Sequence, residues 1–282
     1  MQLQTSTESI NDYVLQKAIP DGSNLYYACV FEEASYKQQI ISFHAFLNEL
    51  IEILIECSDP GIARIKLQWW LEELERLENH QPRHPVTRCL QKSTSIDKEI
   101  IDQLNKVVLS TEGMLLIQQP DSLESALAVF DKQSGIIWQL CAKQFCNNTE
   151  SVIKKINDLS NTYHYLQAIL RPSTYVTESC CLIPSNYIDK QIIFSSKQIS
   201  TQHQEQLRKL LNDLQSKIEE NLSELTKSER HILKHMIILN RIAKKTVIKM
   251  QSHVFPWSTD QVSSTPISKL LFAWWFNTKL RF

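Results

Sequence analysis

Residues 23–75 decide the fold, and they read SNLYYACVFEEASYKQQIISFHAFLNELIEILIECSDPGIARIKLQWWLEELE. Ser23 is well placed as an N-cap before an apolar segment at 25–31. Between Tyr36 and Cys57 the apolar residues cover nearly every angle of a helix, which predicts a helix buried on most sides. Asp59-Pro60-Gly61 then forms a turn before a second helical pattern at 62–79. Because the turn is so short, the two helices are expected to pack antiparallel.

The rest of the chain is also helical in pattern. Four glycines and little strand-like alternation favour long helices over sheets. Further helices are predicted at 86–92, 96–118, 122–145, 151–171, 204–225, 228–250 and 267–282. We expect a break at 80–85, which holds two prolines, and an ordered loop at 173–203. Residues 1–12 are polar and predict a frayed or capping segment, in which Thr7 or Ser9 can start a helix.

Composition limits the class of protein. With 282 residues and 43% apolar content, the chain can bury one large core or two modest ones. Thirty basic residues offset 31 acidic residues, so no nucleic-acid partner is expected. The charge is uneven, because residues 227–282 hold ten basic and two acidic residues, a local balance of 10 − 2 = +8.

The chain has the features of a cytoplasmic protein, either free or peripheral to a membrane. Its first residues show no secretory signal, and no apolar run reaches the roughly 18 residues of a spanning helix. The seven cysteines are odd in number and lack paired CxxC spacing, which indicates reduced core thiols rather than a zinc site.

Four short motifs occur in a fixed order along the chain. They are Ser23-x-x-Tyr26-Tyr27-Ala28, then Ala45-Phe46, then Arg64-x-x-x-x-Trp69-Trp70, then His84-Pro85. Over residues 23–250 the chain thereby resembles the squalene/phytoene synthase family of head-to-head prenyl transferases. This resemblance implies an all-α isoprenoid (terpenoid) synthase fold, a single helical bundle around a central apolar cavity. The domain would span 23–255, after an N-terminal extension at 1–22 and before a linker with an aromatic, basic C-terminal helix at 256–282.

The family's two aspartate-rich motifs, which hold diphosphates through Mg²⁺, are missing. Where the first motif is expected after Ala45-Phe46, the arginine position holds Asn48 and the aspartate positions hold Ile51, Glu52 and Ile55. Where the second is expected, Pro172 follows Arg171. Magnesium demands several carboxylate oxygens, so this set cannot bind it in the family's manner. The pattern resembles the branch that contains the mitochondrial complex I assembly factors and bacterial relatives.

The resemblance therefore implies a lipid-binding or assembly protein that has lost prenyl transfer and needs no cofactor. Its partners would be an isoprenoid or other lipid in the cavity, or another protein. The alternative is a divergent prenyl transferase in which glutamates hold Mg²⁺. The glutamates proposed for that role, as catalytic candidates, are Glu49, Glu52, Glu72 and Glu73, with Glu56 and Glu75 nearby. Helix carboxylates are more often solvated or paired with Lys or Arg.

Several polar residues are candidates for a functional site but have a structural interpretation as well. Tyr27, Arg64 and Arg171 are the ligand-binding candidates, with the arginines able to hold a phosphate or carboxylate or to pair with glutamates. His231 and His235 have metal-ligand spacing, but without a third ligand they indicate surface histidines.

The C-terminal segment 267–282 is aromatic and basic. Its Trp274 and Trp275, flanked by Lys269, Lys279 and Arg281, suit an interfacial membrane anchor or a partner contact. A terminal helix that closes the bundle with its aromatic face inward explains the same pattern.

Overall fold

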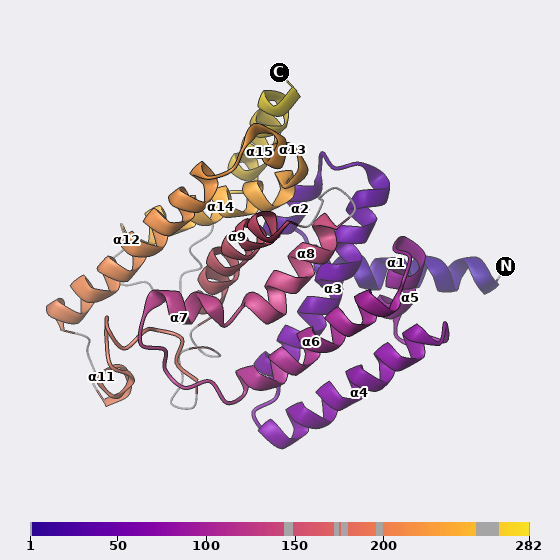
Figure 1. Ribbon diagram of the computed structural model, residues 1–282, viewed down its shortest axis with the longest axis horizontal. Helices are drawn as coiled ribbons and strands as arrows, with labels where there is room; N and C mark the ends of the chain where they lie inside the picture. The colour runs from indigo at the N-terminus through magenta and orange to yellow at the C-terminus, as the bar shows by residue number, and fades with distance from the viewer. Residues whose placement is uncertain are drawn as a thin grey trace.

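The computed structural model describes residues 2–143, 149–171, 175, 180–195, 200–251 and 265–281, and it is an all-α bundle (Figure 1). Its helices are α1 (Gln2–Ala18), α2 (Asn24–Cys29), α3 (Ala34–Glu56), α4 (Pro60–Glu78), α5 (Pro85–Ser93), α6 (Lys98–Met114), α7 (Leu123–Ala128), the π-helix η1 (Asp131–Gly135), α8 (Ile136–Ala142), α9 (Glu150–Ile169), α11 (Lys190–Ser195), α12 (Thr201–Ser223), α13 (Lys227–Ile232), α14 (Lys234–Gln251) and α15 (Pro266–Arg281). The predicted all-α class is confirmed.

The helices and the turn predicted in the stretch at 23–75 are present. Ser23 caps α2 by accepting from Tyr26 N, and the Asp59 carboxylate caps α4 by accepting from Gly61 N and Ile62 N. Pro60 occupies the first turn of α4, where its missing N–H costs no hydrogen bond. α4 packs chiefly on α6, beside which it runs in Figure 1, and makes fewer contacts with α3.

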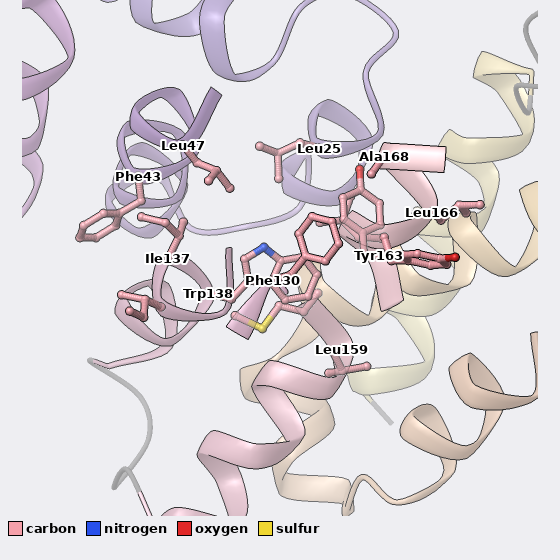
Figure 2. Packing of buried hydrophobic residues seen from close by; sticks show 14 of the residues in the cluster. Leu25, Phe43, Leu47, Phe130, Ile137, Trp138, Leu159, Tyr163, Leu166 and Ala168 are labelled. Carbon is pink, nitrogen blue, oxygen red and sulfur yellow. The ribbon is translucent and has the colours of Figure 1, made fainter. Parts of the chain in front are cut away.

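The core is filled by side chains from α3, α8 and α9. Figure 2 shows Trp138 and Phe130 between Phe43 and Leu47 of α3 and Tyr163 of α9. Trp138, Phe43 and Leu47 are completely buried. Packing of these large side chains in the middle of the bundle is the main source of stability, because each removes apolar surface from water.

Helix boundaries depart from the prediction in three places. α1 begins at Gln2 rather than at Thr7 or Ser9, and it buries Val14 and Ala18 as it packs on α3 and α5. The helix predicted at 122–145 is interrupted by η1, whose Gln133 is turned inward to donate to Thr111 Oγ1 at 2.9 Å. The helix predicted at 228–250 is two helices, because the chain leaves helical geometry at Leu233.

Candidate functional site

A cavity of about 300 Å³ lies where α3 and α9 face each other, and we call it the α3–α9 pocket. α3 contributes His44, Asn48 and Ile51, and α9 contributes Tyr163, His164 and Gln167. The remaining lining residues come from the end of α1, the start of α2 and elsewhere: Ala18, Pro20, Gly22, Ser23, Asn24, Leu25, Arg171, Leu239 and Lys269. The pocket therefore lies beside the segment of α3 where the first metal motif would be expected, and beside Arg171, which precedes the positions of the second.

The α3–α9 pocket is basic. Arg171 and Lys269 line it, and no carboxylate does among the residues the structure describes. Lys269 is only 7% exposed, donates from Nζ to the Gly22 carbonyl at 3.1 Å and lies 5.7 Å from the centre of the Tyr27 ring. Burial lowers the pKa of Lys269. A buried ammonium without a carboxylate partner is best stabilised by an anion.

Three buried histidines surround Trp138 at the inner side of this pocket. The ring centres of His44, His164 and His235 lie 6.4, 5.4 and 6.4 Å from that of Trp138. Burial lowers the pKa of His164 to about 4 and that of His235 to about 3, and it lowers the pKa of His44 well below its usual value. All three are neutral at pH 7. His44 Nε2, His235 Nε2 and Trp138 Nε1 are buried without a hydrogen-bond partner in the described part of the chain.

The glutamates of α3 face away from the α3–α9 pocket. Glu49, Glu52 and Glu56 line a separate cavity of about 230 Å³ between α3 and α4, which we call the α3–α4 pocket. One residue along a helix is a turn of about 100°, so Asn48 and Ile51 face α9 while Glu49 and Glu52 do not. Glu52, the only carboxylate at an expected aspartate position, is thus directed to the other side of α3.

Lys17 of α1 already pairs with the glutamates of the α3–α4 pocket. Its ammonium forms a hydrogen bond with Glu52 and lies 3.4 Å from a carboxylate oxygen of Glu49. Tyr13 donates its hydroxyl to Glu49 at 2.5 Å. Burial lowers the pKa of Lys17, but Glu52 and Glu49 outweigh it and raise the pKa overall, so the ammonium stays charged.

The other two glutamate candidates do not join them. Glu73 is completely buried and accepts hydrogen bonds from Arg83 N at 2.7 Å, His84 N at 2.8 Å, Thr87 Oγ1 at 2.6 Å and Arg76 Nε at 2.8 Å. It therefore holds the turn between α4 and α5. Glu72 is exposed and lies 3.8 Å from Arg76.

Magnesium does not fit these donors as they are arranged. In the described ranges, no group of three or more His, Cys, Asp or Glu side chains is placed to hold a metal ion. The α3–α9 pocket offers amide, imidazole and phenol groups with two cations, whereas Mg²⁺ prefers carboxylate oxygens. In the α3–α4 pocket, the Lys17 ammonium already pairs with Glu49 and Glu52.

The three ligand-binding candidates do not lie together in the structure. Arg171 lines the α3–α9 pocket, but Arg64 is exposed on α4 and pairs with Glu112 at 3.5 Å. Tyr27 is buried beneath Lys269 and does not line the pocket itself. Pro172 and the positions expected for the second motif lie outside the described residues.

The C-terminal residues also separate. Lys269 was expected on the surface beside the tryptophans, but it is buried, because it lies on the face of α15 that packs on α2 and α14. Trp274 and Trp275 are 54% and 42% exposed. The side chains of Lys279 and Arg281 lie outside the described part of the structure.

The histidine prediction is half wrong, and some polar residues were missed. His231 is exposed as expected, but His235 is completely buried, because the break at Leu233 places it at the start of α14 facing the core. His44 and His164 had not been singled out, although each stands in an otherwise apolar helical run, which is the pattern of a buried polar residue.

Comparisons with known proteins agree with the all-α fold. Residues 20–151 match the family model of squalene/phytoene synthase. A crystal structure of a dehydrosqualene synthase in complex with ligand superposes with a TM-score of 0.76 at 12% identity, covering 98% of each chain. Squalene synthase HpnC from Alicyclobacillus acidocaldarius superposes with a TM-score of 0.65 at 10% identity, covering 89% of this chain and 95% of that one. No curated protein matches. None of the helices that the structure describes is long and apolar enough to cross a membrane.

Proposed function

We propose that the chain belongs to the squalene/phytoene synthase family, whose model matches residues 20–151, and that it binds the anionic head of an isoprenoid or other lipid instead of condensing prenyl diphosphates with magnesium. It would then act as a lipid-binding or assembly protein, like the branch of the family that lacks the aspartate motifs. The observation that carries the proposal is the charge of the α3–α9 pocket, which combines Arg171 and Lys269 with no carboxylate.

The chemistry of the pocket supports an anionic ligand. A guanidinium can bind a phosphate or carboxylate through two parallel hydrogen bonds, and Arg171 is exposed and lines the pocket. Lys269 supplies a desolvated second charge. The volume, about 300 Å³, is at the lower end of the range for small-molecule sites, so it suits a head group with a short part of its chain.

The thiols support a reducing compartment, which makes the cytoplasm our proposed location. None of the described cysteines forms a disulfide bond: Cys29, Cys57, Cys89, Cys141, Cys180 and Cys181. Burial raises the pKa of Cys141 and of Cys180, so these thiols are protonated and poorly reactive.

The test separates binding from catalysis. Purified protein incubated with Mg²⁺ and farnesyl or geranylgeranyl diphosphate is expected to form no squalene or phytoene and to release no pyrophosphate above background. Farnesyl diphosphate is nevertheless expected to bind in the presence of EDTA, as measured by isothermal titration calorimetry. Product formation would overturn the proposal, and so would the absence of any metal-independent binding.

Arg171→Gln is expected to weaken this binding about 10- to 100-fold, because a hydrogen bond to a charged group contributes roughly 1.5–3 kcal/mol. The matched control is Arg64→Gln, since Arg64 is also an exposed arginine but pairs only with Glu112. If the two variants bound farnesyl diphosphate with equal affinity, Arg171 would not be part of the binding site.

One observation favours the alternative, a prenyl transferase with a glutamate-based metal site. Glu49, Glu52 and Glu56 do line a common pocket, the α3–α4 pocket. Under this alternative, Glu49→Gln with Glu52→Gln would abolish product formation. Under our proposal the double variant leaves lipid binding in EDTA unchanged, because these side chains lie on the other face of α3. The same calorimetric and product assays decide between the two.

A further inference from the structure

A second and larger cavity, of about 820 Å³, lies between α13, α14 and α15, and we call it the basic cavity. Its titratable lining residues are Lys227, Arg230, His231 and Arg241. The apolar part of the wall is formed by Leu225, Trp275 and Phe276. No carboxylate lines it among the described residues. This cavity is separate from the α3–α9 pocket, with which it shares no lining residue.

Arg241 is held in the wall of the basic cavity, and no carboxylate of the described residues lines that cavity. Its guanidinium carbon lies 5.0 Å from the centre of the Phe276 ring and 5.8 Å from that of Phe272. Its Nε is buried and has no hydrogen-bond partner in the described part of the chain. The aromatic rings orient the guanidinium, but they do not neutralise it.

Arg230 adds a second positive charge that forms no ion pair with the described residues. Its guanidinium donates only to backbone carbonyls, from Nε to Leu225 O at 2.9 Å and from a terminal nitrogen to Leu222 O at 3.4 Å. Burial, and then the charge of Arg230, lowers the pKa of Arg241. The nearby Glu229 is turned away and binds Lys155 at 2.8 Å. The two arginines repel each other, and an anion between them would relieve that repulsion.

Beside this cavity, α15 exposes an apolar stripe. Ile267, Leu270, Leu271 and Trp274 recur at i, i+3, i+4 and i+7 and are 72%, 42%, 59% and 54% exposed. The opposite face of α15, with Lys269, Ala273 and Phe276, is buried. Trp275 connects the two features, because it lines the basic cavity and is itself 42% exposed.

The basic cavity and the apolar stripe of α15 together indicate what binds here, by charge complementarity. An exposed apolar helix face beside cations matches a bilayer whose surface carries anionic lipids. Lys245 extends the positive border, with its ammonium 4.8 Å from the centre of the Phe272 ring. We propose that the basic cavity takes the phosphate head group of an anionic phospholipid while the apolar stripe of α15 enters the interface of the bilayer. The whole bundle is then a peripheral membrane protein.

The test is co-sedimentation with vesicles. The full-length protein is expected to sediment with vesicles of equal parts phosphatidylcholine and phosphatidylglycerol, and not with phosphatidylcholine alone. Arg241→Gln is expected to weaken binding about fivefold, the effect of one cation near an anionic surface. Arg208→Gln, at an exposed arginine of α12, is the charge-matched control and leaves binding unchanged.

The apolar stripe has its own matched pair of variants. Ile267→Gln with Leu271→Gln is expected to weaken vesicle binding at least about tenfold, because two large side chains no longer enter the apolar layer. Ile65→Gln with Leu116→Gln is the control, since Ile65 is also 72% exposed and Leu116 is 68% exposed, both far along the chain from α15. Circular dichroism on each variant confirms that it is folded.

Three outcomes would overturn the proposal. The first is equal sedimentation with neutral and with anionic vesicles, because binding would then not depend on the charge of the lipid head group. The second is binding of inorganic phosphate at Arg241 without any binding to vesicles, which would make this a site for a soluble anion. The third is an equal loss of binding in the stripe variant and in its surface control.

Discussion

Acidification from about pH 7 to about pH 5 is expected to remove about 2 kcal/mol of folding free energy for each buried histidine around Trp138. The pKa of His164 falls from 6.5 to about 4 on folding and that of His235 to about 3, and His44 shifts in the same direction. In each case burial is the first cause. The unfolded chain therefore takes up protons near pH 6.5 that the folded protein cannot accept.

The sign follows from this difference in proton binding. A group whose pKa is depressed by folding stabilises the folded state fully above its unfolded pKa, here above about pH 6.5. That stabilisation is lost as the pH falls from there toward the folded values of about 4 and about 3. Urea unfolding at a series of pH values measures it directly.

The controls for this prediction are two histidine variants. His235→Gln is expected to reduce the pH dependence of the free energy of unfolding by the contribution of one histidine. This holds whatever the substitution does to the stability at pH 7. His231→Gln, at an exposed histidine four residues earlier, is the matched substitution outside the buried cluster. A wild-type protein equally stable at pH 7 and pH 5 would contradict the burial of this cluster.

Glu73→Ala is expected to destabilise the protein by about 3–5 kcal/mol. The substitution leaves the backbone N–H groups of Arg83 and His84 and the guanidinium of Arg76 without their buried acceptor. For a protein of this size, such a loss lowers the melting temperature by about 10 °C. Differential scanning calorimetry measures both quantities.

Glu72→Ala is the matched control for this prediction. Glu72 is the adjacent carboxylate and also lies near Arg76, but its side chain is 53% exposed. Its removal is expected to change the stability by less than about 0.5 kcal/mol. If Glu72→Ala were as damaging as Glu73→Ala, the role of Glu73 in holding the turn would be refuted.

Glu73 also connects residues that carry the resemblance to one another. It fixes the turn at His84-Pro85, and the ring centre of His84 lies 4.8 Å from that of Trp70. Trp70 in turn lies 5.3 Å from Phe46. Residues that carry the resemblance therefore contact one another in the core, and such contacts are needed for the fold whether or not the chemistry remains.

The positions and types of the main helices could be predicted from the sequence, because apolar periodicity and capping are local properties. The turn at Asp59-Pro60-Gly61 and the cap at Ser23 depend on neighbouring residues alone. The interruption at η1 could not be predicted in this way. It depends on Gln133 reaching Thr111, a contact between segments 22 residues apart.

The candidate site could be predicted only in part. The loss of the aspartate motifs is visible in the sequence, and so is the presence of Arg171 beside them. Arg64 and Arg171 looked equivalent, yet only Arg171 lines the α3–α9 pocket. The burial of Lys269 and the pairing of Lys17 with Glu49 both join helices that are distant along the chain.

The sequence by itself determined that this protein is a helical bundle that resembles the squalene/phytoene synthase family and lacks its aspartate motifs, because composition, periodicity and motifs are properties of the chain. Only the tertiary structure decided which charged side chains lie close to one another. A side chain's partners depend on the angle at which its helix packs, so Asn48 and Glu49, neighbours in sequence, line different pockets. The same packing brings Arg230 and Arg241 to one cavity, which no carboxylate lines in the part of the chain that the structure describes.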